Sequence, residues 1–306
     1  MNLSLVRHEH IYQAIKEEHE KYNYPLTSLC KFGNVSRWAY YKWLNRVIPE
    51  SELKNQKIAE AMEKIHTEHP DKGYRRIKDD LERYWATDDD IKINDKRVLR
   101  ICRIKGIKST IKYSNNGCTQ TSSNPQFVAE NILNRKFYSD SPNQKWLTDV
   151  TEFKYYINGQ IHKLYLSAIL DLYDRRIVSY AIGDSNNNSL VFETFDTAIA
   201  KYPNATPLFH SDRGFQYTNK IFHEKLQSLG IHQSMSRVGK CIDNGPMEGF
   251  WGILKRERYY GKKFNDKVSL ITMIKDYIDY YNNKRLERKL GVLTPMEKYN
   301  NYLKIA

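Results

Sequence analysis

Three carboxylate residues of the chain stand where a carboxylate can take part in phosphoryl transfer. Asp149 lies within a strand-like run, Asp212 directly follows a short apolar run, and Glu248 lies at the start of a long helical pattern. Hard divalent cations prefer oxygen ligands, and two such cations can clamp the attacking and leaving oxygens of an in-line displacement at phosphorus. The pattern indicates a two-metal site whose ligands come from three separate elements.

Each carboxylate also has a purely structural interpretation. Asp149 could be a turn or edge residue, and Asp212, which precedes an Arg-Gly pair, could form a turn or a local salt bridge. A helix with Gly245 as N-cap and Pro246 at its first position would place Glu248 where a carboxylate complements the helix dipole or closes a capping box. Taken singly, each residue favours its structural interpretation.

The spacing of the three residues is more informative than any one of them. Asp149 and Asp212 are separated by 62 residues, and Asp212 and Glu248 by 35. This set resembles the DDE motif of retroviral-integrase-like transposases. Two departures occur beside Glu248: Gly249 stands where many relatives have Ser, and Gly245-Pro246 replaces small or β-branched residues. Neither departure removes a metal ligand.

Longer motifs make the resemblance specific. They include Trp146-x-Thr-Asp149-x-Thr-x-Phe, His210-Ser-Asp212-Arg-Gly-x-Gln-Tyr, Ser234-Met-Ser-Arg, Asp243-Asn-x-x-x-Glu248-x-Phe, Tyr280-Tyr281-Asn282-x-x-Arg285, Thr294-Pro295-x-Glu297 and Gly73-Tyr74-Arg75-Arg76-Ile77. Over nearly its whole length the chain resembles the OrfB transposase of the bacterial IS-three insertion-sequence family.

The resemblance implies an α/β fold class, with an RNase H-like mixed five-stranded sheet and flanking helices. It implies that Asp149, Asp212 and Glu248 are catalytic residues and bind two Mg²⁺ or Mn²⁺ ions. The implied activity is metal-dependent DNA strand cleavage followed by strand transfer. Two alternatives stay open: a nuclease of the same fold without joining activity, and a non-catalytic DNA-binding regulator.

The elements that must position these residues follow from the hydrophobic pattern. Asn158-Gly159 between two strand-like runs is a strong hairpin signal. Antiparallel strands followed by alternating helices and strands predict a mixed-sheet α/β domain. We expect strands over residues 145–156, 162–172, 176–183, 207–210 and 231–235, and helices over residues 189–201, 218–229, 246–260 and 265–285.

Upstream of this domain the pattern is helical. Pro25 opens a short helix, Gly33 lies in a tight turn, and Ser36 is the expected N-cap of the next helix. This is a helix-turn-helix pattern, although a plain helical hairpin with Trp38, Tyr41 and Trp43 in its core would look the same. Residues 114–126 contain almost no side chain that can be buried, so they indicate a linker. We expect a helix-turn-helix-like segment over residues 1–50, a second helical DNA-binding segment over 51–112, a linker over 113–134, the catalytic domain over 135–262 and a helical tail over 263–306.

The charge of the chain indicates nucleic acid as its partner. The chain has 49 Lys and Arg residues against 36 Asp and Glu, a net charge of +13. Clustered cations neutralise phosphates and release counterions. Seven basic residues and no acid occupy residues 96–112, along a helix that Asn94 is expected to cap and Gly106 to end. A solvated helix face is the alternative. Our DNA-binding candidates are Arg97, Arg100 and Arg103 in this run and Arg75 and Arg76 upstream.

Further candidates lie beside the three carboxylates. Lys255 follows Glu248 by seven residues, two helical turns along one face, where it could grip DNA phosphates or be an ordinary surface lysine. Arg237 and Lys240 are candidate clamps for the DNA backbone. For His210 we favour a structural role at a strand end over a contact with Asp212.

The remaining composition narrows the class of protein. No run approaches the roughly 18 apolar residues of a membrane helix, and the first residues do not read as a signal peptide. The four scattered cysteines form no CxxC pair, so they indicate neither a zinc site nor a redox pair. We expect a cytoplasmic bacterial protein associated with the nucleoid.

The resemblance implies terminal inverted repeats and target DNA as substrates, an upstream-frame OrfA partner or fusion, and a homo-oligomer on DNA.

Overall fold

The computed structural model describes residues 8–85, 93–111 and 125–305, apart from the side chain of Cys241. The chain divides into two compact units, residues 1–110 and 111–306. Lys112 and the part of the predicted linker up to residue 124 lie outside the described residues. None of the helices in the described ranges is both long and apolar enough to cross a membrane.

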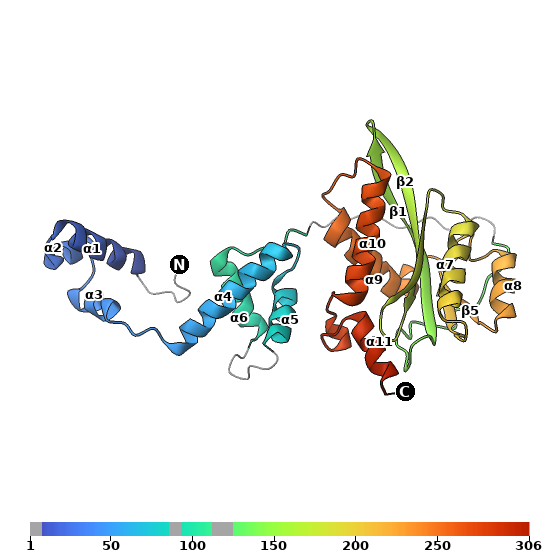
Figure 1. Ribbon diagram of the computed structural model, residues 1–306, viewed down its shortest axis with the longest axis horizontal. Coiled ribbons are helices and arrows are strands. Elements are labelled where there is room, and N and C mark those ends of the chain that lie inside the picture. The colour runs from blue at the N-terminus through green and yellow to red at the C-terminus, as the bar shows by residue number, and fades with distance from the viewer. Residues whose placement is uncertain (1–7, 86–92, 112–124, 306) are drawn as a thin grey trace. The chain divides into compact units, whose positions relative to one another are not determined.

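The first unit begins with three short helices, α1 (Glu9–Tyr22), α2 (Leu26–Phe32) and α3 (Arg37–Leu44) (Figure 1). The predicted N-cap is confirmed, because the Ser36 hydroxyl accepts a hydrogen bond from the Ala39 amide at 3.1 Å. Tyr12, Ile15, Cys30 and Tyr40 form the core of these helices. Trp38, which the hairpin alternative places in the core, is 72% exposed.

Three further helices follow, α4 (Glu50–Glu68), α5 (Tyr74–Tyr84) and α6 (Asp95–Lys105). The expected ends of α6 are confirmed. The Asn94 side chain accepts from the Arg97 amide at 2.7 Å, and Gly106 closes the helix with a φ of 69°. The helices share a core that includes Ile58, Met62, Ile77, Leu81, Val98, Ile101 and Cys102.

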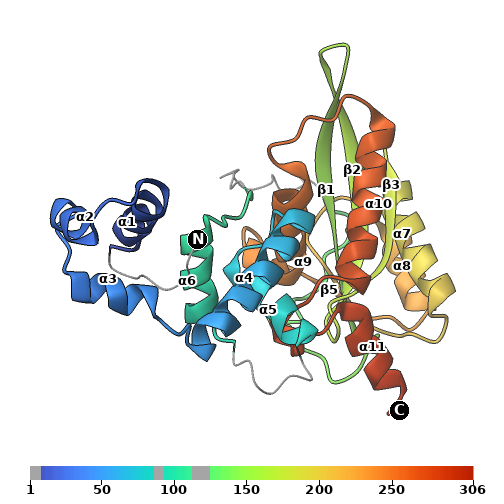
Figure 2. The same cartoon turned by 60° about the vertical axis from the view of Figure 1, so that its left-hand side comes forward.

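The second unit contains the predicted mixed sheet. Its strands are β1 (Lys145–Ile157), β2 (Gln160–Asp171), β3 (Ile177–Gly183), β4 (Leu208–Ser211) and β5 (Gln233–Met235). They lie in the order β3-β2-β1-β4-β5, with β1, β2 and β3 antiparallel and β4 and β5 parallel to β1. Asn158 and Gly159 both have positive φ in the β1–β2 turn, as the hairpin signal predicts. The end of this hairpin projects past the helices of the unit (Figures 1 and 2).

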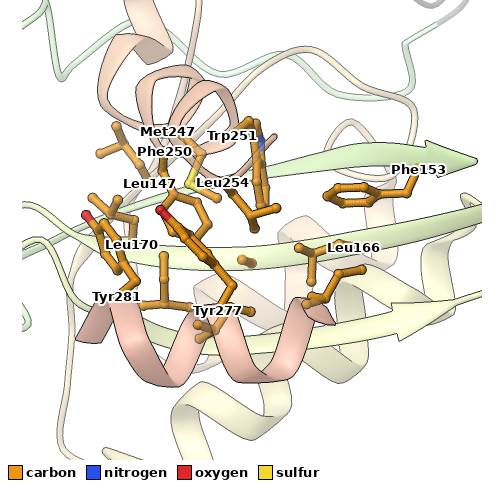
Figure 3. Packing of buried hydrophobic residues seen from close by; sticks show 14 of the residues in the cluster. Leu147, Phe153, Leu166, Leu170, Met247, Phe250, Trp251, Leu254, Tyr277 and Tyr281 are labelled. Atoms are coloured by element: carbon orange, nitrogen blue, oxygen red, sulfur yellow. The ribbon is translucent and has the colours of Figure 1, made fainter. Parts of the chain in front are cut away.

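Helices cover both faces of the sheet (Figure 1). Helices α7 (Asn188–Lys201) and α8 (Lys220–Ser228) pack on one face, around Phe195, Phe209 and Phe222. On the other face, α9 (Gly245–Leu254) and α10 (Lys267–Asn283) pack against inward side chains of β1 and β2 (Figure 3). Two hydrophobic layers therefore fix the central strands from both sides.

The start of α9 differs from our prediction. The helix begins at Gly245, directly after a 3₁₀ turn η1 (Cys241–Asn244), so the N-cap position belongs to Asn244 and Glu248 is the fourth helical residue. Asn244 makes no capping hydrogen bond, because its amide nitrogen donates to the Thr148 carbonyl at 3.1 Å. The capping-box interpretation of Glu248 therefore loses its geometric basis, whereas its place in the first helical turn still complements the helix dipole.

The far end of this helix also differs. We predicted one helix to residue 260, whereas a π-helical turn, η2 (Lys255–Tyr259), replaces its last turn. The inserted turn accompanies an inward-facing Glu257, which is 8% exposed and accepts hydrogen bonds from Tyr277 and Arg285. A π turn is wider than an α-helical turn, so the side chains of η2 point in other directions than they would in a regular α-helix.

The two ends of the second unit pack onto it. Within the stretch that we assigned to the linker, Ala129 and Leu133 are buried, and the Leu133 amide donates to Ser234 at 3.1 Å. At the other end, η3 (Arg288–Leu290) leads to α11 (Pro295–Leu303), which begins with a complete capping box of Thr294 and Glu297.

Candidate catalytic site

The sheet brings Asp149 and Asp212 to the same level of two neighbouring strands. In the parallel pairing of β1 with β4, Leu147 lies opposite His210. Asp149 and Asp212 each follow these partners by two residues, Asp149 inside β1 and Asp212 directly after the end of β4. Neighbouring strands lie about 4.8 Å apart. The two carboxylates, remote in sequence, are therefore adjacent in the fold.

The Asp149 carboxylate is oriented by one donor at each oxygen. Oδ1 accepts from the Val150 amide at 2.8 Å, and Oδ2 accepts from the Trp251 indole nitrogen at 3.0 Å. A carboxylate offers about four lone-pair sites, so both oxygens keep acceptor capacity. The carboxylate of Asp149 is therefore held in place while some of its acceptor sites stay unused.

The Asp212 carboxylate is oriented by the turn that follows it. Oδ1 accepts from the Gly214 amide at 2.8 Å. A Cβ atom at Gly214 would lie 3.0 Å from this oxygen and 3.0 Å from Oε1 of Gln216, which is tighter than side chains normally tolerate. The glycine in the Asp-Arg-Gly motif thus lets the backbone approach the carboxylate closely.

Glu248 reaches the site from a helix. It lies in the N-terminal part of α9, and its side chain is exposed. The start of α9 is tied to β1, because Asn244 donates to the Thr148 carbonyl next to Asp149. The structure therefore draws the three predicted carboxylates from β1, the end of β4 and α9, as the sequence pattern required.

The three carboxylates influence one another electrostatically. Burial, together with the charges of Asp212 and Glu248, raises the pKa of Asp149 to about 8. Burial also raises the pKa of Asp212. Burial and the charge of Asp212 raise the pKa of Glu248. Clustered acids of this kind hold a proton unless a cation neutralises them.

The same carboxylates do not form a finished coordination sphere. Across residues 8–85, 93–111 and 125–305, no three His, Cys, Asp or Glu side chains lie close enough together to hold a metal ion. The donor chemistry is nevertheless that of a divalent-cation site, since all three side chains offer carboxylate oxygens and Gly214 leaves room beside Asp212.

His210 has the structural role that we favoured. Its ring nitrogens lie 2.9 Å and 3.2 Å from the hydroxyls of Ser234 and Ser236. The residue is fully buried, and burial lowers its pKa to about 4, so the ring is neutral near pH 7. This histidine fixes the packing of β4 against β5.

Lys255 lies half-buried at the start of the π turn. Its ammonium group lies 5.1 Å from the centre of the Phe153 ring. Burial lowers the pKa of Lys255, while the charges of Asp149 and Glu152 oppose that shift. The lysine therefore belongs to the electrostatic surroundings of Asp149, and its contact with DNA stays a prediction.

Arg237 and Lys240 lie in the loop before α9, in different settings. The backbone amide and guanidinium of Arg237 donate three hydrogen bonds of 2.8–3.1 Å to Asp243. Lys240 is exposed. Arg237 is exposed too, but its charge is matched by Asp243, which makes Lys240 the stronger DNA-binding candidate of the two.

The candidate arginines of the first unit differ in their exposure, with Arg76 and Arg97 partly buried. Arg97 donates to Asn55 at 2.8 Å, and Arg76 donates to Asp71 at 3.2 Å. Arg75, Arg100 and Arg103 are exposed. On α6, Arg100 and Arg103 are three residues apart and share one helix face.

Sequence reasoning missed two residues of the site. Asp243 is fully buried and accepts from Asn131, Arg135 and Arg237. Trp251 donates directly to Asp149. The motif Asp243-Asn-x-x-x-Glu248-x-Phe contains Asp243, but a tryptophan on an apolar helix face gives no sign of a specific hydrogen bond.

Models of known protein families match three regions of the chain. Residues 139–241 and 248–303 match models described as integrase core domain, and residues 52–114 match an HTH-like domain. The magnesium-bound catalytic core of HTLV-2 integrase is 21% identical, with a TM-score of 0.42, over 53% of this chain and 99% of that one.

Insertion-sequence proteins match along most of the chain. InsK of insertion sequence element IS150 from Escherichia coli K12 is 35% identical over 90% of this chain and 94% of its own length. The transposase of element IS904 from Lactococcus lactis is 33% identical over 69% of this chain and 83% of its own. Transposase InsF of IS3A from Escherichia coli K12 is 25% identical over 93% and 96%. The chain therefore belongs to the DDE transposases of the IS3 family, as the OrfB-type polypeptide that carries the integrase-type catalytic core.

Proposed function

We propose that Asp149, Asp212 and Glu248 are the catalytic residues of this transposase and that they bind two Mg²⁺ or Mn²⁺ ions. The observation that carries the proposal is the register of β1 and β4, which sets Asp149 beside Asp212. The raised pKa values of all three carboxylates support it, because such a cluster is relieved by bound cations.

The protein side of the mechanism follows from how each carboxylate is held. Asp149 and Asp212 are oriented by N–H donors before any ion arrives, so they form the fixed half of the site. The exposed Glu248 side chain completes the site from α9. When bound, the two ions would activate the attacking oxygen and stabilise the leaving 3′-oxygen.

The reaction has two steps that use the same residues. Water first cleaves the phosphodiester at the end of the element and leaves a 3′-hydroxyl, and this hydroxyl then attacks a phosphodiester of the target. One P–O bond forms and one breaks in each step. By holding the ions, the three carboxylates would keep the phosphate and the incoming oxygen in line.

We propose α6 as the main DNA contact of the first unit. Its exposed basic residues Lys96, Arg100 and Arg103 follow one another at spacings of four and three, which is the repeat of one helix face. The match of residues 52–114 to an HTH-like domain supports this choice. Arg75 would contact DNA from α5. In the second unit, Lys240 and Lys255 would hold the backbone near the carboxylates.

The finer organisation also remains our proposal. We keep the first two predicted segments, and we join residues 125–134 and the tail over 263–306 to the catalytic domain, because Leu133 and the inward side chains of α10 share its core. The substrates would be the terminal inverted repeats of an insertion sequence and a target DNA. An upstream-frame OrfA partner and a homo-oligomer on the nucleoid complete the proposal.

The test is a cleavage and joining assay with labelled element ends, target DNA and Mg²⁺, run with and without the upstream-frame partner. We expect Glu248→Gln to lower both cleavage and joining by about a thousandfold or more, since a lost metal ligand removes several kcal/mol of transition-state stabilisation. DNA affinity should stay unchanged. Unchanged joining in this variant would contradict the catalytic assignment, and cleavage without joined product would favour the nuclease alternative.

A paired experiment tests the DNA surface. Replacing Arg100 and Arg103 together by Ala should weaken DNA binding and reduce the slope of log affinity against log salt by about two. The matched control removes the same charge from α4 by replacing Lys57 and Lys64, which are also exposed. Equal losses in both double variants would show that overall charge, and not the α6 face, binds DNA.

A further inference from the structure

The hydrogen bond from Trp251 to Asp149 joins two parts of the candidate site. The indole nitrogen lies 3.0 Å from Oδ2 of Asp149. The ring is 6% exposed and packs among Met247, Phe250 and Leu254 of its own helix over the sheet (Figure 3). A buried indole offers one N–H donor in a direction that the packing of its ring fixes.

Trp251 and Asn244 attach α9 to consecutive residues of β1. Asn244 stands four residues before Glu248 and donates to the carbonyl of Thr148. Trp251 stands three residues after Glu248 and donates to the carboxylate of Asp149. Residues three and four apart share one face of a helix. The face of α9 that carries Glu248 is therefore fastened to β1 on both sides of this glutamate.

We propose that Trp251 is a positioning residue for cation binding: its indole N–H orients the Asp149 carboxylate and sets its distance from the helix that carries Glu248. The inference rests on the proposed function, because it assigns a role toward the same carboxylates. Donors behind a ligating carboxylate commonly change metal affinity by 10-fold to 100-fold.

A second observation points to the same junction. Asn244 is 3% exposed, and its Oδ1 atom accepts no hydrogen bond from any described residue. A buried amide oxygen without a donor is costly, so such atoms call for an explanation. Its place beside Thr148, one residue from Asp149, fits an oxygen that accepts a hydrogen bond from water held at the cation site.

The chain supplies a matched control for the indole donor. Trp146 is fully buried in the same unit, and its indole nitrogen donates to Oδ2 of Asp171 at 3.2 Å. Both tryptophans thus donate to an aspartate, but only Trp251 donates to a carboxylate of the candidate site. Trp→Phe at either position removes the donor and keeps an aromatic ring.

The experiment measures Mn²⁺ binding by calorimetry on the full chain without DNA, beside thermal unfolding of each variant. We expect Trp251→Phe to weaken Mn²⁺ binding by about 10-fold to 100-fold. Trp146→Phe should keep Mn²⁺ affinity within about twofold, even if its melting temperature falls further. The cleavage assay gives a second readout. In the Trp251 variant, the Mn²⁺ concentration for half-maximal rate should rise by a larger factor than the factor by which the maximal rate falls.

A second substitution protects the test against misfolding. Benzothienylalanine at position 251 keeps the fused ring and has sulfur in place of the N–H donor, and it should reproduce the loss of affinity. Wild-type affinity in both Trp251 variants would overturn the inference and leave the metal site intact. Absence of Mn²⁺ binding by the wild-type chain would instead overturn the proposed function itself.

Discussion

Two carboxylates of the second unit, Asp243 and Asp149, show opposite ways of placing a negative charge inside a protein. Asp243 is fully buried and accepts five hydrogen bonds from Asn131, Arg135 and Arg237. These donors hold its pKa well below its usual range. Asp149 has two N–H donors and two acidic neighbours, and its pKa is raised to about 8.

The difference in hydrogen-bond donors distinguishes a carboxylate that stabilises the fold from one that is available to a bound cation. Asp243 is compensated by cations that the chain itself supplies, so it stabilises the junction of the residue 131–135 stretch with the loop before α9. Among the residues that the structure describes, Asp149, Asp212 and Glu248 form no salt bridge with a basic side chain. A fold that leaves acids in this state gives up stability at the site, as active sites commonly do. The missing charge is what a divalent cation would bring.

The largest effect should come from making the same substitution at both positions. Asp243→Asn should destabilise the second unit by roughly 2–4 kcal/mol, because two arginines lose their buried partner. Asp149→Asn should stabilise the metal-free protein by about 1 kcal/mol, because it removes repulsion and leaves a neutral group in place. Denaturant unfolding at pH 7 without divalent cations measures both changes. Changes of the same sign would remove the distinction between the two carboxylates.

A smaller effect should appear in the pH dependence of stability. The pKa of His210 is lowered to about 4 by burial, against its ordinary value of 6.5. Between these pH values the unfolded chain binds a proton that the folded chain lacks, so stability should fall as pH falls, by about 2–3 kcal/mol. Above pH 6.5 this contribution is fully present.

Replacing the histidine isolates that contribution. His210→Asn removes the titrating ring, so the stability of this variant should depend less steeply on pH between 6.5 and 4. The measurement is thermal or denaturant unfolding across this range for both proteins. Equal slopes would mean that His210 is protonated in the folded state and is not a neutral packing residue.

The sequence predicted those features that depend on local patterns. The β1–β2 hairpin follows from alternating residues around Asn158-Gly159, and the limits of α6 follow from Asn94 and Gly106. The three candidate catalytic carboxylates were proposed from their spacing and from the resemblance, since each alone favoured a structural role. Strand register, which brings Asp149 beside Asp212, is a tertiary property that only the paired strands reveal.

The features that sequence reasoning missed depend on long-range contacts. Asn244 bonds to Thr148 instead of capping α9, and nothing in the residues around it indicates that partner. The π turn accompanies an ion pair between Glu257 and Arg285, 28 positions apart. Trp251 looks like any core aromatic until its donor is seen to meet Asp149. Such contacts override local propensity.

Calorimetric titration of Mn²⁺ into the wild-type chain, the Asp149→Asn variant and the Asp243→Asn variant tests the central claim most directly. The account predicts that the wild-type chain binds Mn²⁺ and that Asp149→Asn weakens this binding by about 100-fold or more, the loss of a direct ligand exceeding that of a supporting donor. Asp243→Asn should keep most of the affinity while it remains folded. Equal binding by the wild-type and Asp149→Asn chains would contradict the claim that these carboxylates form the cation site.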